Sequence, residues 1–321
     1  MQSLTEEKRI NRRIVARVSF GADLYLIAMF AAQFAFLGGA ILLSAVVPFE
    51  DAHYDILDGI SAISAVFFGC VLLWQYAAQS RRRGVLFREN TVIRTILHRE
   101  KRVSLRTFAA FAAMIYLFQF LFSLSLEILE LILNQFDLTV MNSPAMNADY
   151  TLNLPLLLYA IFLGPLAEEF VFRGVLMKGL RPCGRVFAIV VSALLFSLMH
   201  GDIQQLGFTF AAGLVMGYAA MEYSILVSYL IHVFNNGVIS ELMTLLADKV
   251  SEDTFTALSL ALITVAAAYT LWYLIRNRHA MRQYLRDHPP QPGALGGLFN
   301  VWFIAFVVFG IAETIMTITP L

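Results

Sequence analysis

Residues 164–174 read GPLAEEFVFRG, and they place two adjacent carboxylates, Glu168 and Glu169, inside an apolar run that begins near residue 152. This run is long enough to span a membrane as a helix, and Pro155 suits the first turn of that helix. A charged side chain at the centre of a span costs about 2.5–3.5 kcal/mol by insertion scales. A chain that keeps two such charges needs partners for them, and usually a function that requires them.

The two carboxylates have different neighbours in their own helix. Glu169 and Arg173 are four residues apart with the acid first, which is the favourable order and predicts a structural ion pair. Glu168 is rotated by about 100° from Glu169, so it points elsewhere and lacks a cation in its own helix. Glu168 is therefore either a functional carboxylate or a carboxyl group that lies near the water interface.

The composition is that of a membrane protein with several spans. The chain has 321 residues, of which 59% are hydrophobic and only 14% are charged, and its net charge of zero gives no indication of a nucleic-acid partner. A polar break at residues 201–205 divides the 186–222 region into two spans, or into one span and a re-entrant piece. We therefore expect an all-α transmembrane bundle of eight or nine spans, in contact with membrane lipid. The apolar runs lie near residues 22–48, 56–79, 106–133, 152–177, 186–203, 204–222, 225–247, 255–275 and 296–318.

Positive charges predict the orientation of the chain. Four clusters hold all but two of the 23 lysines and arginines, and they fall on one side of the membrane if the spans alternate. The positive-inside rule then predicts a cytoplasmic N-terminus. Compact loops, and a sequence without eukaryotic sorting signals, favour a bacterial inner (cytoplasmic) membrane. The clusters lie in residues 8–17, 81–106, 178–185 and 276–286.

Three further polar side chains lie deep in apolar runs: His200, His232 and Asn236. His232 and Asn236 are four residues apart and share one helix face, whereas Asn235 points about 100° away. Either histidine alone could be a hydrogen bond between helices. Together with Glu168, these groups could hydrolyse an amide with water, because a carboxylate can take the proton, a second base can orient the water and neutral donors can stabilise the oxyanion.

Other intramembrane protease chemistries fit the sequence poorly. His-Glu-x-x-His, the zinc-protease motif, does not occur, and neither Gly-x-Ser-Gly nor Gly-x-Gly-Asp is present for a serine or aspartyl mechanism. Glu168, His200 and His232 could nevertheless bind a divalent metal such as zinc as an open two-histidine, one-carboxylate site. A metal therefore remains one option, and no cofactor is required by the sequence.

The deep polar residues form three short motifs, which follow one another within spans in the order Glu168-Glu169-x-x-x-Arg173, Phe196-x-x-x-His200 and His232-x-x-x-Asn236. This order and spacing resemble the pattern of the CAAX-protease and bacteriocin-processing (CPBP, or Abi) family of intramembrane endopeptidases. The resemblance covers about residues 150–245. Outside it, the first three helices match the family only in being hydrophobic. We expect a three-helix N-terminal region at 1–135 with a basic cytoplasmic loop, a catalytic helical core at 150–247 and C-terminal transmembrane helices at 248–321.

The resemblance also implies roles for single residues and a membrane-bound peptide or protein as the substrate. Glu168 would be the general base, His200 would help to bind the water, His232 and Asn236 would form the oxyanion site, and Glu169 and Arg173 would support them. Family members have been described both as metalloproteases and as glutamate-dependent enzymes, so a metal at Glu168, His200 and His232 stays an alternative.

Two other classes of function remain as alternatives. A family member that does not use its catalytic residues could act as an immunity or binding protein. An ion-coupled transporter could use Glu168 and the histidines as a proton path, although the deep polar groups are concentrated in one half of the chain with no evident counterpart repeat.

Overall fold

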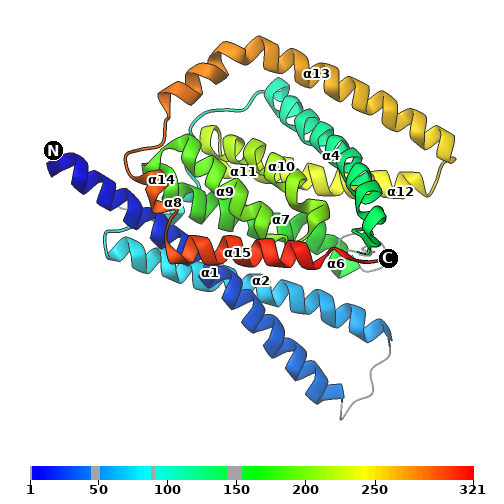
Figure 1. Ribbon diagram of the computed structural model, residues 1–321, viewed down its shortest axis with the longest axis horizontal. Coiled ribbons are helices and arrows are strands. Elements are labelled where there is room, and N and C mark those ends of the chain that lie inside the picture. The colour runs from blue at the N-terminus through cyan, green and yellow to red at the C-terminus, as the bar shows by residue number, and fades with distance from the viewer. Residues whose placement is uncertain (1, 45–50, 88–90, 143–153) are drawn as a thin grey trace.

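Helices make up nearly all of the chain that the computed structural model describes, namely residues 2–44, 51–87, 91–142 and 154–321 (Figure 1). They follow the predicted apolar runs closely, and the first helix also includes the basic N-terminal segment. A pair of two-residue strands, β1 (Leu138–Thr139) and β2 (Thr319–Pro320), is antiparallel. The helices that carry none of the predicted site residues are α1 (Gln2–Ser44), α2 (Asp51–Arg82), α3 (Val92–Ile96), α4 (Leu105–Leu133), α12 (Met243–Ala247), α13 (Glu252–Asp287), α14 (Ala294–Gly297) and α15 (Val301–Met316).

Within the described residues, five helices are long and apolar enough to cross a membrane, so the chain is a multi-pass membrane protein. They are Ser3–Ser44, Gly59–Arg82, Leu105–Phe136, Ile225–Ala247 and Glu252–Asp287. The helices α9 (Arg185–Met199) and α15 are apolar but shorter. The all-α class is therefore confirmed, whereas the number of eight or nine spans stays a prediction.

The polar break near residue 201 separates two distinct helices. α9 ends at Met199, and α10 (Ile203–Glu222) begins after Asp202, whose side chain accepts a hydrogen bond of 2.8 Å from the backbone N–H of Gln204. Such a carboxylate cap satisfies one of the free N–H groups at a helix start. Between the helices, Gly201 has a φ of +58°, a conformation that suits glycine.

The helix that carries the Glu168 motif is not a regular α-helix. It runs through α6 (Leu154–Leu158), α7 (Gly164–Glu168) and α8 (Lys178–Leu180), which alternate with the π-helical segments η2 (Tyr159–Leu163) and η3 (Glu169–Met177). A third π-helical segment, η5 (Asn235–Leu242), follows α11 (Ile225–Phe234). Single turns of π-helix occur frequently at functional sites because they rotate side chains out of the regular α-helical positions.

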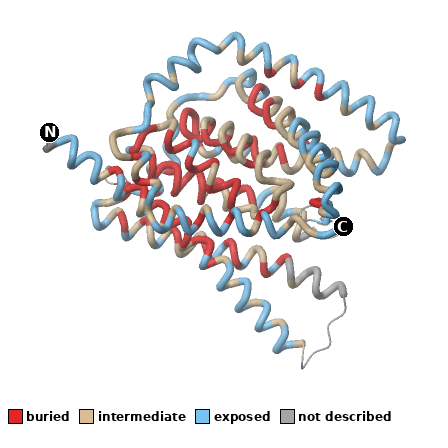
Figure 2. Tube along the Cα trace, viewed as in Figure 1, coloured by how far each residue is buried: buried red, intermediate tan, exposed pale blue. Residues whose placement is uncertain are grey.

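The most buried residues lie where α9, α10 and η3 pack together, seen as the concentration of red in the middle of Figure 2. Glycines allow the close contact of α9 with α10. A Cβ atom at Gly213 would lie 3.0 Å from that of Ala193, and one at Gly217 would lie 3.1 Å from Ile189. Small residues of this kind let membrane helices approach closely.

One ion network joins three helix ends and a loop at one end of the bundle. Arg185, at the start of α9, contacts Glu222 at 2.7 Å, and the Tyr284 hydroxyl of α13 donates to the same carboxylate at 2.8 Å. Lys101, from the segment before α4, lies 3.4 Å from the other oxygen of Glu222. The network fixes the basic 97–104 segment against the end of α10.

The structure corrects the placement of Lys178. The positive cluster at residues 178–185 predicts a loop after the span, but Lys178 continues the buried helix and is only 3% exposed. Its Nζ has no hydrogen-bond partner among the described residues. Burial lowers the pKa of Lys178 from 10.5 to about 8.

Candidate active site

The structure places Glu168 beside His232. Glu168 ends α7, and its Oε2 lies 3.5 Å from Nε2 of His232 on α11. The Glu168 side chain is 22% exposed, whereas that of His232 is only 7% exposed. Two side chains that are 64 positions apart in the sequence therefore face the same small space, with the carboxylate on its more open side.

Glu169 lies on the other side of the His232 ring and is almost completely buried. Its Oε1 lies 3.1 Å from Nδ1 of His232 and 3.3 Å from Nη1 of Arg173. The Ser228 hydroxyl donates to the second oxygen of Glu169. The predicted ion pair of Glu169 with Arg173 is thus present, and it is part of a larger cluster. Ser228 was not predicted, although it lies four residues before His232 and so shares a helix face with it.

Phe196 packs against each of the basic side chains in this cluster. The Arg173 guanidinium lies 4.1 Å from the centre of the Phe196 ring and makes a cation–π contact with it. Arg173 is completely buried. The His200 and His232 rings stand nearly perpendicular to the Phe196 ring, at 4.7 Å and 5.9 Å between ring centres. Phe196 therefore sets the separation of the two imidazoles.

His200 is held by the backbone of its own helix. Its Nδ1 lies 2.8 Å from the carbonyl oxygen of Phe196. A carbonyl only accepts, so this contact assigns the proton to Nδ1 and leaves Nε2 as the acceptor of a neutral ring. Such an arrangement suits a histidine that orients water rather than one that donates to an oxyanion.

Asn236 is bound to two groups near the Glu168 helix. Its Nδ2 donates to the carbonyl oxygen of Ala160 at 2.8 Å, and its Oδ1 accepts from Nδ2 of Asn235 at 3.0 Å. Regular helix spacing rotates Asn235 by about 100° from Asn236, and both asparagines nevertheless line the same pocket. One N–H of Asn236 remains available to another acceptor.

A pocket of about 490 Å³ connects these groups. Glu168, His200, His232 and Asn236 all contribute to its wall, so the four predicted catalytic residues open onto one space. Much of the remaining wall is apolar. This combination, an apolar pocket with a few convergent polar groups, is typical of small-molecule and peptide sites.

The opposite wall of the pocket comes from α4, a helix in the expected N-terminal region. Gln119 and Ser123 of α4 face the space that Glu168 borders. The side-chain oxygen of Gln119 is buried and has no hydrogen-bond partner among the described residues. Gln119 was not predicted, because it lies outside the three motifs, and the only signal was an amide within an apolar run.

The described side chains do not form a metal site as they are placed. Residues 2–44, 51–87, 91–142 and 154–321 contain no group of three or more histidines, cysteines, aspartates or glutamates that could hold a metal ion. Nδ1 of His232 is bound to Glu169 and Nδ1 of His200 to Phe196, so each ring turns only its Nε2 toward the pocket.

Comparison with known families agrees with the geometry. A family model described as type II CAAX prenyl endopeptidase Rce1-like matches residues 150–238. The matched segment contains all three motifs, so the resemblance to the CAAX-protease family is confirmed over this part of the chain, and it supports a membrane protease of the CAAX-endopeptidase type. No curated protein and no solved structure matches the chain.

Proposed function

We propose that this chain, which resembles the type II CAAX endopeptidases over residues 150–238, hydrolyses a peptide bond within the membrane with water activated by Glu168. The observation that carries the proposal is the 3.5 Å approach of the Glu168 carboxylate to His232 at the wall of a pocket that His200 and Asn236 also line. A carboxylate and an imidazole at this separation can act on one water molecule.

Glu168 is the proposed general base. It takes a proton from the water as the water oxygen bonds to the carbonyl carbon of the substrate, and a tetrahedral intermediate forms. Glu168 then returns the proton to the nitrogen as the C–N bond breaks, which releases a carboxylic acid and an amine. The 22% exposure of Glu168, compared with 1% for Glu169, makes it the carboxylate that can reach both water and substrate.

The other groups orient the water and stabilise the oxyanion. His200 accepts from the water through Nε2, because Nδ1 is bound to the Phe196 carbonyl. His232, whose Nδ1 is bound to Glu169, turns Nε2 toward the pocket and donates to the oxyanion when Nε2 carries a proton. The free N–H of Asn236 is the second donor. Preorganised donors of this kind are each worth about 3 kcal/mol of barrier.

The proposed substrate is a membrane-bound peptide or protein, and a prenylated CAAX peptide is the first to test, because the matched family is described by that substrate. The charge clusters favour a cytoplasmic N-terminus, and the compact loops favour an inner-membrane location. Residues 150–247 would form the catalytic core between the N-terminal and C-terminal helices, with α4 completing the pocket.

The test is cleavage of a fluorogenic farnesylated CAAX peptide by the purified protein in nanodiscs. The general-base role predicts that Glu168→Gln lowers kcat by a factor of about 10²–10⁴ while the protein remains folded. Glu127→Gln changes an exposed carboxylate of α4 outside the pocket and is the matched control. A Glu168→Gln protein that cleaves as fast as the wild type would rule out this mechanism.

A further inference from the structure

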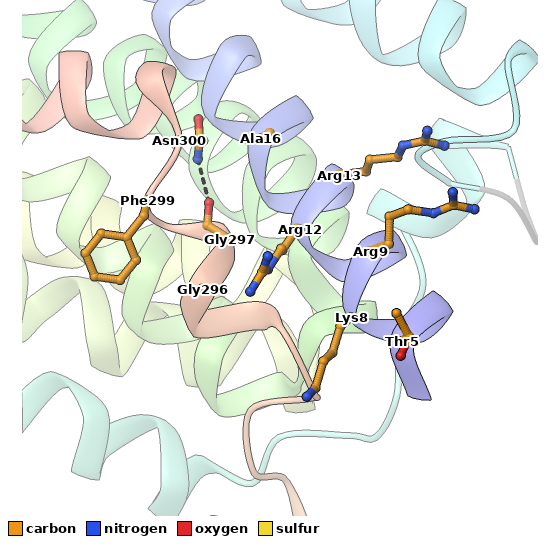
Figure 3. A pocket seen from close by; sticks show the side chains of 10 residues that line it. All are labelled: Thr5, Lys8, Arg9, Arg12, Arg13, Ala16, Gly296, Gly297, Phe299 and Asn300. Carbon is orange, nitrogen blue, oxygen red and sulfur yellow. Dashed lines mark hydrogen bonds between the residues drawn. The ribbon is translucent and has the colours of Figure 1, made fainter. Parts of the chain in front are cut away.

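A second hollow, of about 530 Å³, lies between the start of α1 and the turn that leads from α14 into α15 (Figure 3). Its α1 wall carries the side chains Lys8, Arg9, Arg12 and Arg13. Its other wall is formed by Gly296, Gly297, Phe299 and Asn300. The proposed catalytic pocket shares none of these residues.

Close backbone contacts hold the two walls together. Gly293 has a φ of +84°, and a Cβ there would lie 2.6 Å from the carbonyl oxygen of Lys8. A Cβ at Gly297 would lie 2.9 Å from Val15, and the Asn11 amide donates to the carbonyl oxygen of Pro292 at 2.9 Å. The α14 turn therefore lies directly on α1, and the hollow has fixed walls.

The charge in the hollow is almost uncompensated. Among the described lining residues, none is acidic. Arg9 has one weak exposed partner, Glu6, at 3.9 Å. In the described part of the chain, Lys8 and Arg12 form no salt bridge, and Figure 3 shows both side chains directed toward the α14 side. Several cations around one concave surface attract an anion such as a phosphate group.

Arg12 is positioned by the turn itself. A Cβ at Gly296 would lie 3.2 Å from Nη2 of Arg12, so the glycine leaves room for the guanidinium beside the helix. A guanidinium presents several N–H donors in a fixed plane, an arrangement that matches phosphate oxygens. Lys8, one turn earlier on α1, adds a second cation at the same wall.

An exposed apolar surface begins at the edge of the hollow. Phe299 is 85% exposed, and it is followed on α15 by Val301, Ile304 and Val308, which are 68%, 48% and 60% exposed. The last three are spaced by three and four residues, so they share one face of α15. This face leads away from the cations along an apolar helix, as an acyl chain would lie.

We propose that this hollow binds an anionic phospholipid, with its phosphate at Lys8 and Arg12 and its acyl chains along the exposed face of α15. A cationic hollow continuous with an apolar helix face matches both parts of such a lipid, whereas a free phosphate would use only the cations. The hollow also lies on the side that the basic clusters predict to be cytoplasmic. Anionic lipids in that leaflet attract positively charged protein segments.

The experiment measures lipid binding to the purified, delipidated full-length protein by native mass spectrometry, with phosphatidylglycerol and phosphatidylcholine as probes. Each cation near an anionic lipid contributes about a fivefold change in affinity. Lys8→Gln/Arg12→Gln is therefore expected to raise the Kd for phosphatidylglycerol about 25-fold and to leave that for phosphatidylcholine unchanged. Arg282→Gln/Arg286→Gln removes two exposed charges from α13, outside the hollow, and should bind as the wild type does.

Three results would overturn the proposal. One is an unchanged Kd for phosphatidylglycerol in the Lys8/Arg12 variant, and another is an equal loss in the α13 control. The third comes from thermal unfolding of the wild type. If inorganic phosphate protects the protein as well as phosphatidylglycerol does, the ligand is a free anion. If the double variant does not fold, Arg12→Gln alone should raise the Kd about fivefold. Glu168→Gln should bind the lipid normally, so this test is independent of the proposed protease activity.

Discussion

The carboxylate of Glu169 and the Nδ1 atom of His232 lie 3.1 Å apart in the interior of the helix bundle. This contact determines which imidazole nitrogen faces the pocket, because the carboxylate accepts the Nδ1 proton and leaves Nε2 directed at Glu168. The two adjacent glutamates therefore act on opposite sides of one ring. In the proposed mechanism, Glu168 would react with water while Glu169 would position His232.

The first prediction concerns this positioning contact. Glu169→Gln keeps the shape but removes the charge at Nδ1, so we expect kcat to fall about 10–100-fold with little change in KM. Ser228→Ala removes only a neutral donor to Glu169 and should have a smaller effect. Kinetics on the peptide that the wild type cleaves would check this, and a change confined to KM would contradict the positioning role.

The second prediction concerns the buried charge of Arg173. Arg173→Met removes the guanidinium beside the buried Glu169 carboxylate and should lower the free energy of unfolding by about 3–5 kcal/mol. The double variant Glu169→Gln/Arg173→Met removes both charges and should recover part of that loss. A double-mutant cycle by reversible unfolding in SDS measures the coupling. Additive losses in the cycle would show that the pair does not interact.

Local spacing in the sequence was enough to predict part of this site. Glu169 and Arg173 are four residues apart in one helix, so their ion pair follows from local geometry, and the long apolar runs gave the helices. Asn235 was not predicted to line the pocket, because that depends on how its helix packs and not on local spacing. Gln119 was missed because its role depends on where α4 packs, which no local motif records.

Lys178 illustrates the same difficulty at the end of a helix. A lysine three residues before Arg181, just beyond an apolar run, ordinarily indicates a loop. Here the helix continues for three more residues and packs inward, so Lys178 is buried. Charge patterns identify the side of the membrane but do not distinguish an exposed lysine from one covered by neighbouring elements.

The third prediction concerns Gln119. Its buried side-chain oxygen has no partner in the described chain and borders the proposed catalytic pocket, so we expect it to accept a hydrogen bond from a backbone N–H of the substrate. A net hydrogen bond is worth about 1 kcal/mol, so Gln119→Leu should raise KM about fivefold with little change in kcat. Gln33→Leu, on an exposed part of α1, is the matched control. An unchanged KM for Gln119→Leu would exclude this contact.

The fourth prediction is a pH dependence of stability that arises from Lys178. Burial lowers its pKa in the folded protein to about 8, whereas the unfolded value is 10.5, so between these values the unfolded chain binds more protons. The free energy of unfolding should therefore rise as the pH rises from 8 to 10.5, and the full penalty of the buried charge is present below pH 8.

The shift in the pKa of Lys178 corresponds to a free-energy penalty of up to about 3 kcal/mol for the buried charge. Lys178→Met removes this penalty, so the variant should be more stable than the wild type at pH 7. The difference should shrink as the pH approaches 10, because the wild-type lysine then loses its proton in the folded state. Lys249→Met, at an exposed lysine, controls for the loss of one positive charge. Unfolding in SDS at several pH values tests this, and a stability difference that stays constant between pH 7 and 10 would show that the Lys178 ammonium is well solvated in the folded protein.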